Sequence, residues 1–363
     1  MRAALWIGLG LAGYVAVEAG VFHTRVYSHW LNADSSAGLM DIYLTNEQRR
    51  YAQGPAESHR ADVLVIGDSR MTLMPRVANE LTPETGYTFA TIAIAGSTPR
   101  CWYYMLRETD PRANRYAAVV IGLENYDDQE TLEDRSKRAS DLNYVLPYLE
   151  LKDLAEFAGS YPLWEERARA ARGILFKGTI YQQDVFDFLQ NPRKRVHDDR
   201  VVRRESARWY YDYSGVPTDD TDVAIDFDRH SIQAGANRSA TQLLGFRQRY
   251  LDPLPQQQGR EAAYLRKWLG KIYVHYQGSR TRLIFVKLPR GPVVRPDLPP
   301  PNLLSSVRAL AAHSEVALLP EHAFETLEKP ILFWDFMHLN QAGAERFSHM
   351  AAREVRAVLG PPR

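Results

Sequence analysis

The sequence predicts an α/β protein: a three-layer domain with a central parallel sheet of about five strands, preceded by one transmembrane helix. Two observations predict this class. Short runs of continuous apolar residues, each closed by Gly or Pro, alternate with helical stretches. Such runs are typical of parallel strands that helices cover on both faces. In addition, one apolar stretch at the amino end is about long enough to cross a bilayer, and no second stretch of that length follows.

The amino-terminal stretch, Ala3 to Phe22, is apolar except for Glu18. Three interpretations are open: an uncleaved membrane anchor over residues 1–22, a secretory signal peptide cleaved after Ala19, or a buried helix. The anchor is favoured because the run is long for a signal peptide and the chain stays apolar to Phe22. The rest of the chain then lies on one side of the membrane, outside the cytoplasm if the amino end stays inside.

Residues 23–60 follow as a polar and aromatic juxtamembrane segment, and residues 61–363 form the main domain. Each expected strand is a short apolar run, and the last helix carries apolar residues at helical spacing. The strands are expected at Val63–Ile66, Phe89–Ile94, Ala117–Ile121, Leu283–Val286 and Val316–Leu319, and the closing helix at Asn340–Leu359.

The connection between the third and fourth strands is far longer than a single crossover helix needs. It therefore contains a large insertion, at about residues 126–281. Helical patterns cover Leu142–Phe157 and Gly259–His275 within it. The insertion also holds a basic cluster, which either forms a solvated surface or meets an anionic polymer or lipid headgroups. Its members are Arg193, Lys194, Arg195, Arg200, Arg203, Arg204 and Arg208.

Composition excludes several classes of protein. The 363 residues carry 45 Lys plus Arg against 44 Asp plus Glu, whereas a general nucleic-acid binder normally has a basic excess. A hydrophobic content of 45% indicates a folded chain rather than a disordered one. The single cysteine, Cys101, rules out an intrachain disulfide framework and a multi-cysteine zinc site. The His residues show no paired ligand spacing, so we expect no metal and no cofactor.

Two short motifs carry the chemistry. The first strand ends in Gly67-Asp68-Ser69, which places a serine where parallel α/β sheets bind their ligands. Far along the chain, Asp335 and His338 are spaced so that the carboxylate can orient the imidazole. The other imidazole nitrogen can then take the proton of the serine. We therefore expect Ser69 as nucleophile, His338 as base and Asp335 as the orienting acid. Asp68 is expected to hold the turn.

These positions resemble the SGNH (GDSL-like) hydrolase superfamily, in four short blocks rather than in continuous similarity. The nucleophile block carries Arg70 where hydrolases often have Leu. The resemblance implies a flavodoxin-like three-layer fold and an oxyanion hole built from the backbone N–H groups of Ser69 and Gly96. The third block usually reads Gly-x-Asn-Asp, but here Glu124 takes the Asn position. Asn125, one residue on, is therefore the candidate third donor.

The anchor and the motif Gly-Asp-Ser-Arg resemble a smaller group, the DltD-like and alginate-O-acetylation-like proteins of bacterial cell envelopes. This resemblance implies a domain on the periplasmic side of the inner membrane that works with a membrane-bound O-acyltransferase. It implies O-acyl transfer, of acetyl or a similar group, to an envelope polysaccharide or teichoic-type polymer. Arg70, Lys287 and Arg290 lie near the expected site, where cations either suit an anionic polymer or are simply solvated. The alternatives are an envelope carbohydrate esterase and a non-catalytic scaffold for the acyltransferase.

Overall fold

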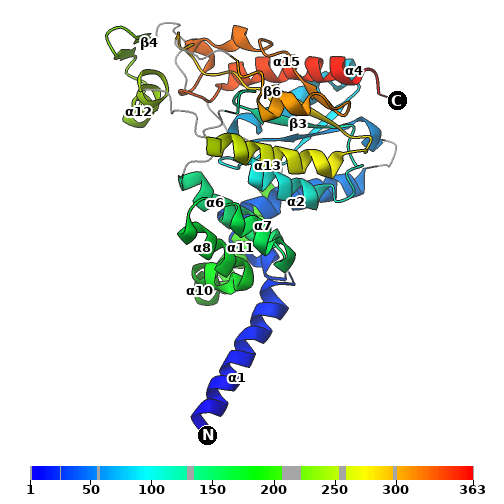
Figure 1. Cartoon of the computed structure of the whole chain (residues 1–363), viewed down its shortest axis with the longest axis vertical. Coiled ribbons are helices and arrows are strands. Elements are labelled where there is room, and N and C mark those ends of the chain that lie inside the picture. Colours follow the sequence, from blue (N-terminus) through cyan, green and yellow to red (C-terminus); the bar gives the residue numbers. More distant parts are fainter. Residues whose placement is uncertain are drawn as a thin grey trace. The chain divides into compact units, whose positions relative to one another are not determined.

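The chain divides into two compact units, which are described separately. The helical unit comprises Met1–Arg50, Tyr104–Thr109 and Glu133–Trp209, and the sheet unit comprises the rest. The insertion expected at about 126–281 is thus divided between them (Figure 1). The computed structural model describes residues 2–24, 26–54, 58–128, 135–206, 222–252, 259–296 and 301–362.

A five-stranded parallel sheet forms the centre of the sheet unit, which confirms the predicted α/β class. Its strand order is β2-β1-β3-β6-β7, and the order reverses between β1 and β3. In open parallel sheets, the crevice at the carboxyl ends of the strands beside such a reversal is where ligands bind. The strands are β1 (Asp62–Ile66), β2 (Thr88–Thr91), β3 (Ala118–Leu123), β6 (Arg282–Lys287) and β7 (Val316–Leu318).

Helices cover both faces of the sheet, as its continuous apolar strands require. Two long helices, α13 (Gly259–Tyr276) and α15 (Gln341–Leu359), lie on opposite sides of it (Figure 1). The α15 side packs Phe347 and Ala351 against the strands and α3 (Met74–Ala78) in one buried cluster. A large apolar side chain such as Phe347 contributes about 1.5–3 kcal/mol when fully buried. The remaining helices of the unit are α4 (Thr82–Thr85), the start of α5 (Pro99–Thr109), α12 (Ala240–Phe246) and α14 (Ser306–Leu310).

Residues 222–252 form a separate feature of the sheet unit, which we call the clamp segment. It consists of an antiparallel hairpin, β4 (Val223–Asp226) and β5 (Ser231–Ala234), followed by α12 and a π-helical turn. Phe246 and Tyr250 are buried in a second, smaller hydrophobic cluster, and Phe336 packs against this cluster. This contact joins the clamp segment to the loop that carries the Asp-x-x-His motif.

The helical unit begins with α1 (Arg2–Val17), which continues through a π-helical turn from Glu18 to Phe22. The helical pattern expected over 142–157 is interrupted: Pro147 lies in one of two 3₁₀ turns between α6 and α7, because proline removes a backbone donor. The other helices are α2 (Ser36–Gln53), α6 (Arg135–Val145), α7 (Leu154–Gly159), α8 (Trp164–Leu175), α9 (Lys177–Ile180), α10 (Gln182–Gln190) and α11 (Pro192–Glu205).

The helix at the amino end is long and apolar enough to cross a membrane, with a mean hydropathy of 1.6 over Leu5–Phe22. Glu18, the one acidic residue in this stretch, is buried, and its carboxylate oxygens accept from the backbone N–H of Gly178 at 3.1 and 3.2 Å. The part of the expected juxtamembrane segment up to Arg50 is folded within this unit: Asp41 of α2 is buried and accepts from Tyr148 Oη at 2.9 Å.

Candidate active site

The turn after β1 fixes the serine. Asp68 caps the 3₁₀ turn Ser69–Met71, and its Oδ1 accepts from the backbone N–H of Arg70 at 3.0 Å. The position directly before Asp68 requires glycine, because Gly67 has φ +156° and a Cβ there would lie 2.7 Å from Cγ of Met71. A Cβ at Gly122, near the end of β3, would lie 2.5 Å from the same Cγ of Met71. The two glycines therefore let Met71 fill the space beneath the turn while Ser69 stays partly exposed.

The three residues expected to form a triad lie in hydrogen-bond succession. Ser69 Oγ is 2.8 Å from His338 Nε2, and His338 Nδ1 is 2.8 Å from Asp335 Oδ2. The carboxylate accepts a hydrogen bond from the N–H at Nδ1, so Nε2 presents its lone pair to the serine hydroxyl. Oδ1 of Asp335 accepts from the backbone N–H groups of Met337 and His338 at 2.8 and 2.7 Å, which fixes the carboxylate itself.

Asp335 is held in its ionised form. Burial raises the pKa of this carboxyl group, but the hydrogen bonds from the side chain and backbone of His338, with that from Met337, outweigh the effect. The net result is a pKa below the ordinary 3.8. A carboxylate that stays charged near neutral pH can stabilise an imidazolium on His338, which is what a general base needs after it takes a proton.

Two backbone N–H groups are available to bind an oxyanion. Gly96 lies in a turn with φ +70°, in the left-handed region that glycine adopts without strain. The turn is tied to β1, because Ile94 N and Ser97 Oγ both donate to the carbonyl of Gly67, at 3.1 and 3.0 Å. Within the part of the chain that the structure describes, neither the Ser69 nor the Gly96 backbone N–H donates a hydrogen bond.

The polar side chains of the third block are engaged in contacts of their own. Glu124 lies 2.9 Å from Nη1 of Arg249 and 3.9 Å from Nη1 of Arg70, so its charge is balanced on both sides. Oδ1 of Asn125 accepts from the backbone N–H of Asp127 at 2.8 Å, which is a turn-forming role. The hydrogen bonds that link the triad do not include Asn125. Arg249 comes from the clamp segment, and no motif in the sequence pointed to it.

The clamp segment also holds the loop of Asp335 and His338. Arg238 donates through Nε to Asp222 at 2.7 Å and through its terminal nitrogens to the carbonyls of Trp334 and Phe333. Gln242 Nε2 donates to the Trp334 carbonyl as well, at 2.9 Å. A further bond, 3.2 Å long, joins Tyr250 Oη to the carbonyl of Phe336. Backbone carbonyls on both sides of Asp335 are therefore fixed by side chains of the insertion.

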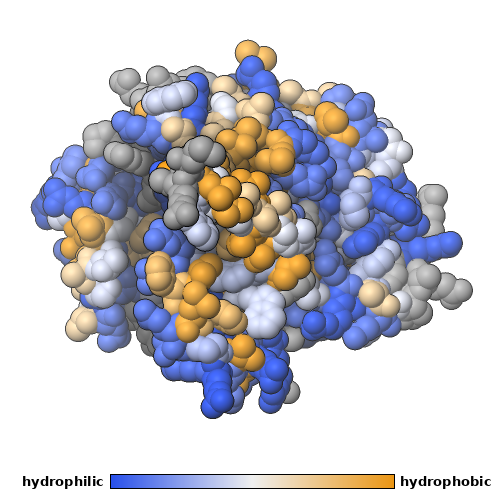
Figure 2. All heavy atoms as spheres, turned by 90° about the horizontal axis from the view of Figure 1, so that it is seen from below, coloured by the Kyte–Doolittle hydropathy of each residue, from blue (hydrophilic) through white to orange (hydrophobic). Residues whose placement is uncertain are grey.

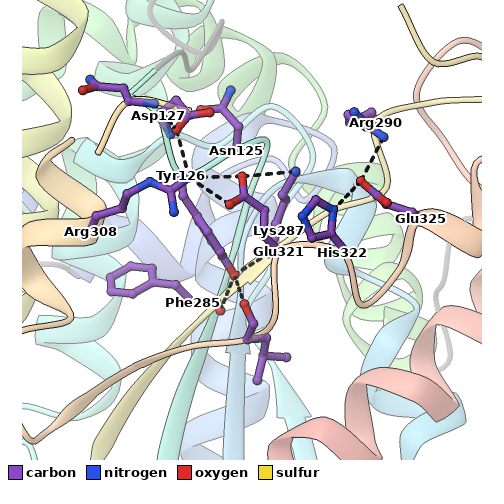
Figure 3. A network of polar contacts seen from close by, with 12 residues as sticks. Asn125, Tyr126, Asp127, Phe285, Lys287, Arg290, Arg308, Glu321, His322 and Glu325 are labelled. Carbon is purple, nitrogen blue, oxygen red and sulfur yellow. Dashed lines mark hydrogen bonds and ion pairs between the residues drawn. The ribbon is translucent and has the colours of Figure 1, made fainter. Parts of the chain in front are cut away.

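A polar network lies beyond the ends of β3, β6 and β7 (Figure 3). Tyr126 Oη shares its proton between the carbonyls of Phe285, in β6, and Leu319, just after β7, and it accepts from Lys287 N at 2.9 Å. The cations near the expected site are paired: Lys287 Nζ lies 3.3 Å from Glu321, and Arg290 contacts Glu325 and, at 2.6 Å, Glu328. Arg70 is likewise paired, with Asp68 at 2.9 Å. None of the three cations adds uncompensated charge to the site.

Cys101 is fully buried in α5. Among the described residues, no three His, Cys, Asp or Glu side chains gather in a way that could hold a metal ion. Comparison of the sequence with protein-family models and with curated proteins gives no match.

Proposed function

We propose that this protein is a serine-dependent O-acyltransferase that acts on a bacterial cell-envelope polysaccharide through an acyl-serine. The observation that carries the proposal is the hydrogen-bonded succession Ser69–His338–Asp335 at the carboxyl edge of the sheet, with both bonds at 2.8 Å. A scaffold without activity has no need of a serine, a base and an orienting carboxylate in this order. The resemblance to the SGNH superfamily supports the same chemistry.

The proposed reaction has two steps. Ser69 Oγ attacks the acyl carbonyl carbon while His338 Nε2 takes the hydroxyl proton, and the Ser69 and Gly96 backbone N–H groups bind the oxyanion. The tetrahedral intermediate expels the donor's oxygen, which receives that proton from His338, and the acyl-serine remains. A sugar hydroxyl then gives its proton to His338 and attacks the acyl carbon, and collapse returns Ser69 Oγ with its proton. Water in place of the sugar would give hydrolysis.

Transfer is favoured over hydrolysis by the apolar α1, which would keep the site beside a membrane donor on the periplasmic face of the inner membrane. The expected partner is a membrane-bound O-acyltransferase, as in the envelope proteins that the sequence resembles. Because Arg70, Lys287 and Arg290 are paired with carboxylates, we propose a neutral polysaccharide as acceptor rather than an anionic teichoic-type polymer.

The test is complementation of a gene deletion. Acyl ester on the envelope polymer is measured in the deletion strain and after complementation with wild type, Ser69→Ala or the control Ser314→Ala, which changes an exposed serine. Transfer predicts that ester content falls in the deletion and is restored by Ser314→Ala but not by Ser69→Ala. A rise in the deletion strain identifies a deacylating esterase, and restoration by Ser69→Ala identifies a scaffold.

A further inference from the structure

The helical unit exposes large apolar side chains near the carboxyl end of the apolar helix that begins with α1, and we call this group the collar. Exposed apolar patches of this kind mark interaction sites on soluble domains. Leu189, for example, is 68% exposed. Figure 2 looks at the molecule from the side of the free end of α1, and hydrophobic residues, those of α1 among them, lie in the middle of this view. The collar consists of Val26, Trp30, Leu175, Phe176, Phe186 and Leu189.

Two contacts tie the collar to the end of the apolar helix. The ring of Phe176 lies 6.1 Å from that of Tyr14, which is inside the apolar stretch Leu5–Phe22. His23 Nε2 lies 3.3 Å from the carbonyl of Leu175. Tyr14 is one helical turn before Glu18, or about 6 Å along the axis. The α8–α9 junction therefore reaches the level of residues that would lie within the membrane.

The π-helical turn fixes this arrangement. The buried carboxylate of Glu18 accepts from the backbone N–H of Gly178, the second residue of α9. Phe22 packs its ring 5.9 Å from Tyr181, directly before α10. Tyr27 Oη donates to Asp184 of α10 at 2.7 Å. Because α9 is bonded to Glu18 of the apolar helix and α10 to Tyr27 just after it, the collar cannot move away from this helix without breaking these polar contacts.

A groove of about 430 Å³ lies beside Trp30, and it holds part of the basic cluster. Arg193 and Arg200 line it and have no ion-pair partner among the residues that the structure describes. The other arginines differ: Arg195 is buried and paired with Asp184 and Asp187, and Arg203 is paired with Asp41, while Arg208 lies outside the described residues. Free guanidinium groups beside an aromatic ring suit phosphate headgroups at a membrane surface.

We infer that the collar enters the headgroup region of a phospholipid bilayer, with Arg193 and Arg200 against the lipid phosphates. The inference rests on the membrane-anchor part of the proposed function and not on its acyl chemistry. A lipid surface is favoured over a protein partner because the collar continues the apolar surface of α1 on several elements. A protein partner would instead be expected to cover a single face of the helical unit. Tryptophan and arginine are also the residues that membrane interfaces select.

The test places a label on the collar of the full-length protein. Leu189→Cys is compared with Leu151→Cys, each in a Cys101→Ala background. Leu151 is the matched control because it is 59% exposed in the same unit and lies just before α7. Figure 1 shows α7 farther than α10 from the free end of α1. Each cysteine carries an environment-sensitive fluorophore, and the protein is reconstituted in vesicles of phosphatidylcholine and phosphatidylglycerol.

Quenching by a lipid with a nitroxide near its headgroup should be several-fold stronger at position 189 than at position 151, and quenching by iodide should show the reverse order. Equal iodide quenching at both positions would overturn the inference. Protection of position 189 in native membranes but not in lipid vesicles would mean that a protein covers the collar, and the inference would then be wrong. Extraction of the protein by alkaline carbonate would also overturn it, because α1 would then be no anchor.

The arginines have a separate readout. The variant Arg193→Gln with Arg200→Gln should lose most of the additional lipid quenching that phosphatidylglycerol gives over pure phosphatidylcholine. Lys194→Gln is the matched control, because Lys194 lies on the same helix and is paired with Asp198 at 2.7 Å. If the control loses as much as the double variant, the groove does not bind headgroups. None of these readouts depends on Ser69, so failure here and failure of the acyl chemistry are distinguishable.

Discussion

Replacing Arg238 by methionine should both destabilise the clamp segment and slow the reaction, although Arg238 is not one of the triad residues. Its side chain is 1% exposed and its partner Asp222 is buried as well. Methionine fills much of the same volume but donates no hydrogen bond. The substitution therefore leaves a buried carboxylate without its cation, and it removes donors from the carbonyls of Trp334 and Phe333.

The cost follows from these losses. Breaking a buried ion pair by removing one partner costs about 3–5 kcal/mol, and an unsatisfied buried carbonyl costs about 1–3 kcal/mol. The terms overlap, because Gln242 still donates to the carbonyl of Trp334. We expect the free energy of unfolding to fall by about 3–5 kcal/mol. A displacement of the Asp335–His338 loop by about 1 Å would lower kcat by about 10²-fold.

Urea unfolding and hydrolysis of 4-nitrophenyl acetate measure the two effects. The matched control is Arg229→Met, since Arg229 lies in the same hairpin but its side chain is 84% exposed. The double variant Arg238→Met with Asp222→Asn removes both charges and should regain more than half of the lost stability. If Arg238→Met leaves the unfolding midpoint and kcat at the values of the Arg229→Met control, the clamp segment does not hold the catalytic loop.

Three further predictions concern the site and the anchor. Because the pKa of Asp335 is lowered, its stabilising contribution is present above about pH 4 and is lost on further acidification; Asp335→Asn should flatten acid unfolding there. If the amide Nδ2 of Asn125 is the third oxyanion donor while its Oδ1 stays in the turn, Asn125→Ala should lower kcat by about 10²–10³-fold and Glu124→Ala by less; the reverse order would show that Asn125 is no oxyanion donor. Amino-terminal sequencing of the mature protein should find residues 3–22 retained; a sequence beginning at Gly20 would contradict the anchor.

The sheet could be predicted because its strands are covered on both faces. A run such as Val63–Ile66 is apolar at every position. In a folded domain this pattern indicates a strand that is buried on both sides, and all four residues are buried. The closing helix was predictable for a related reason, since Asn340 caps it and accepts from Gly343 N at 2.9 Å. Helices inside the insertion were harder to predict, because the apolar spacing over 142–157 continues across the break at Pro147.

The site was predictable only where its residues belong to short motifs. Ser69, Asp335 and His338 were identified in this way and lie within hydrogen-bond distance in succession, while their catalytic roles stay a prediction. Arg238 and Arg249 were not foreseen. Their partners are distant in the sequence, as with Arg238 and Trp334, which are 96 residues apart. An arginine in a polar insertion looks like any solvated arginine until the fold shows which carbonyl or carboxylate it faces.

The separation of Ser69 from His338 has a consequence for how the protein is made. The two residues are 269 positions apart, and Tyr87 Oη donates to the carbonyl of Gly360 at 3.1 Å, so the sheet unit cannot close before residue 360 has been translated. At about 5–20 residues per second, roughly 13–54 s pass between synthesis of the serine and of the histidine. A nascent chain already inserted by its amino end would carry an unactivated hydroxyl throughout this interval. Under the proposed acyl chemistry, a stalled or truncated product would lack the base that activates Ser69.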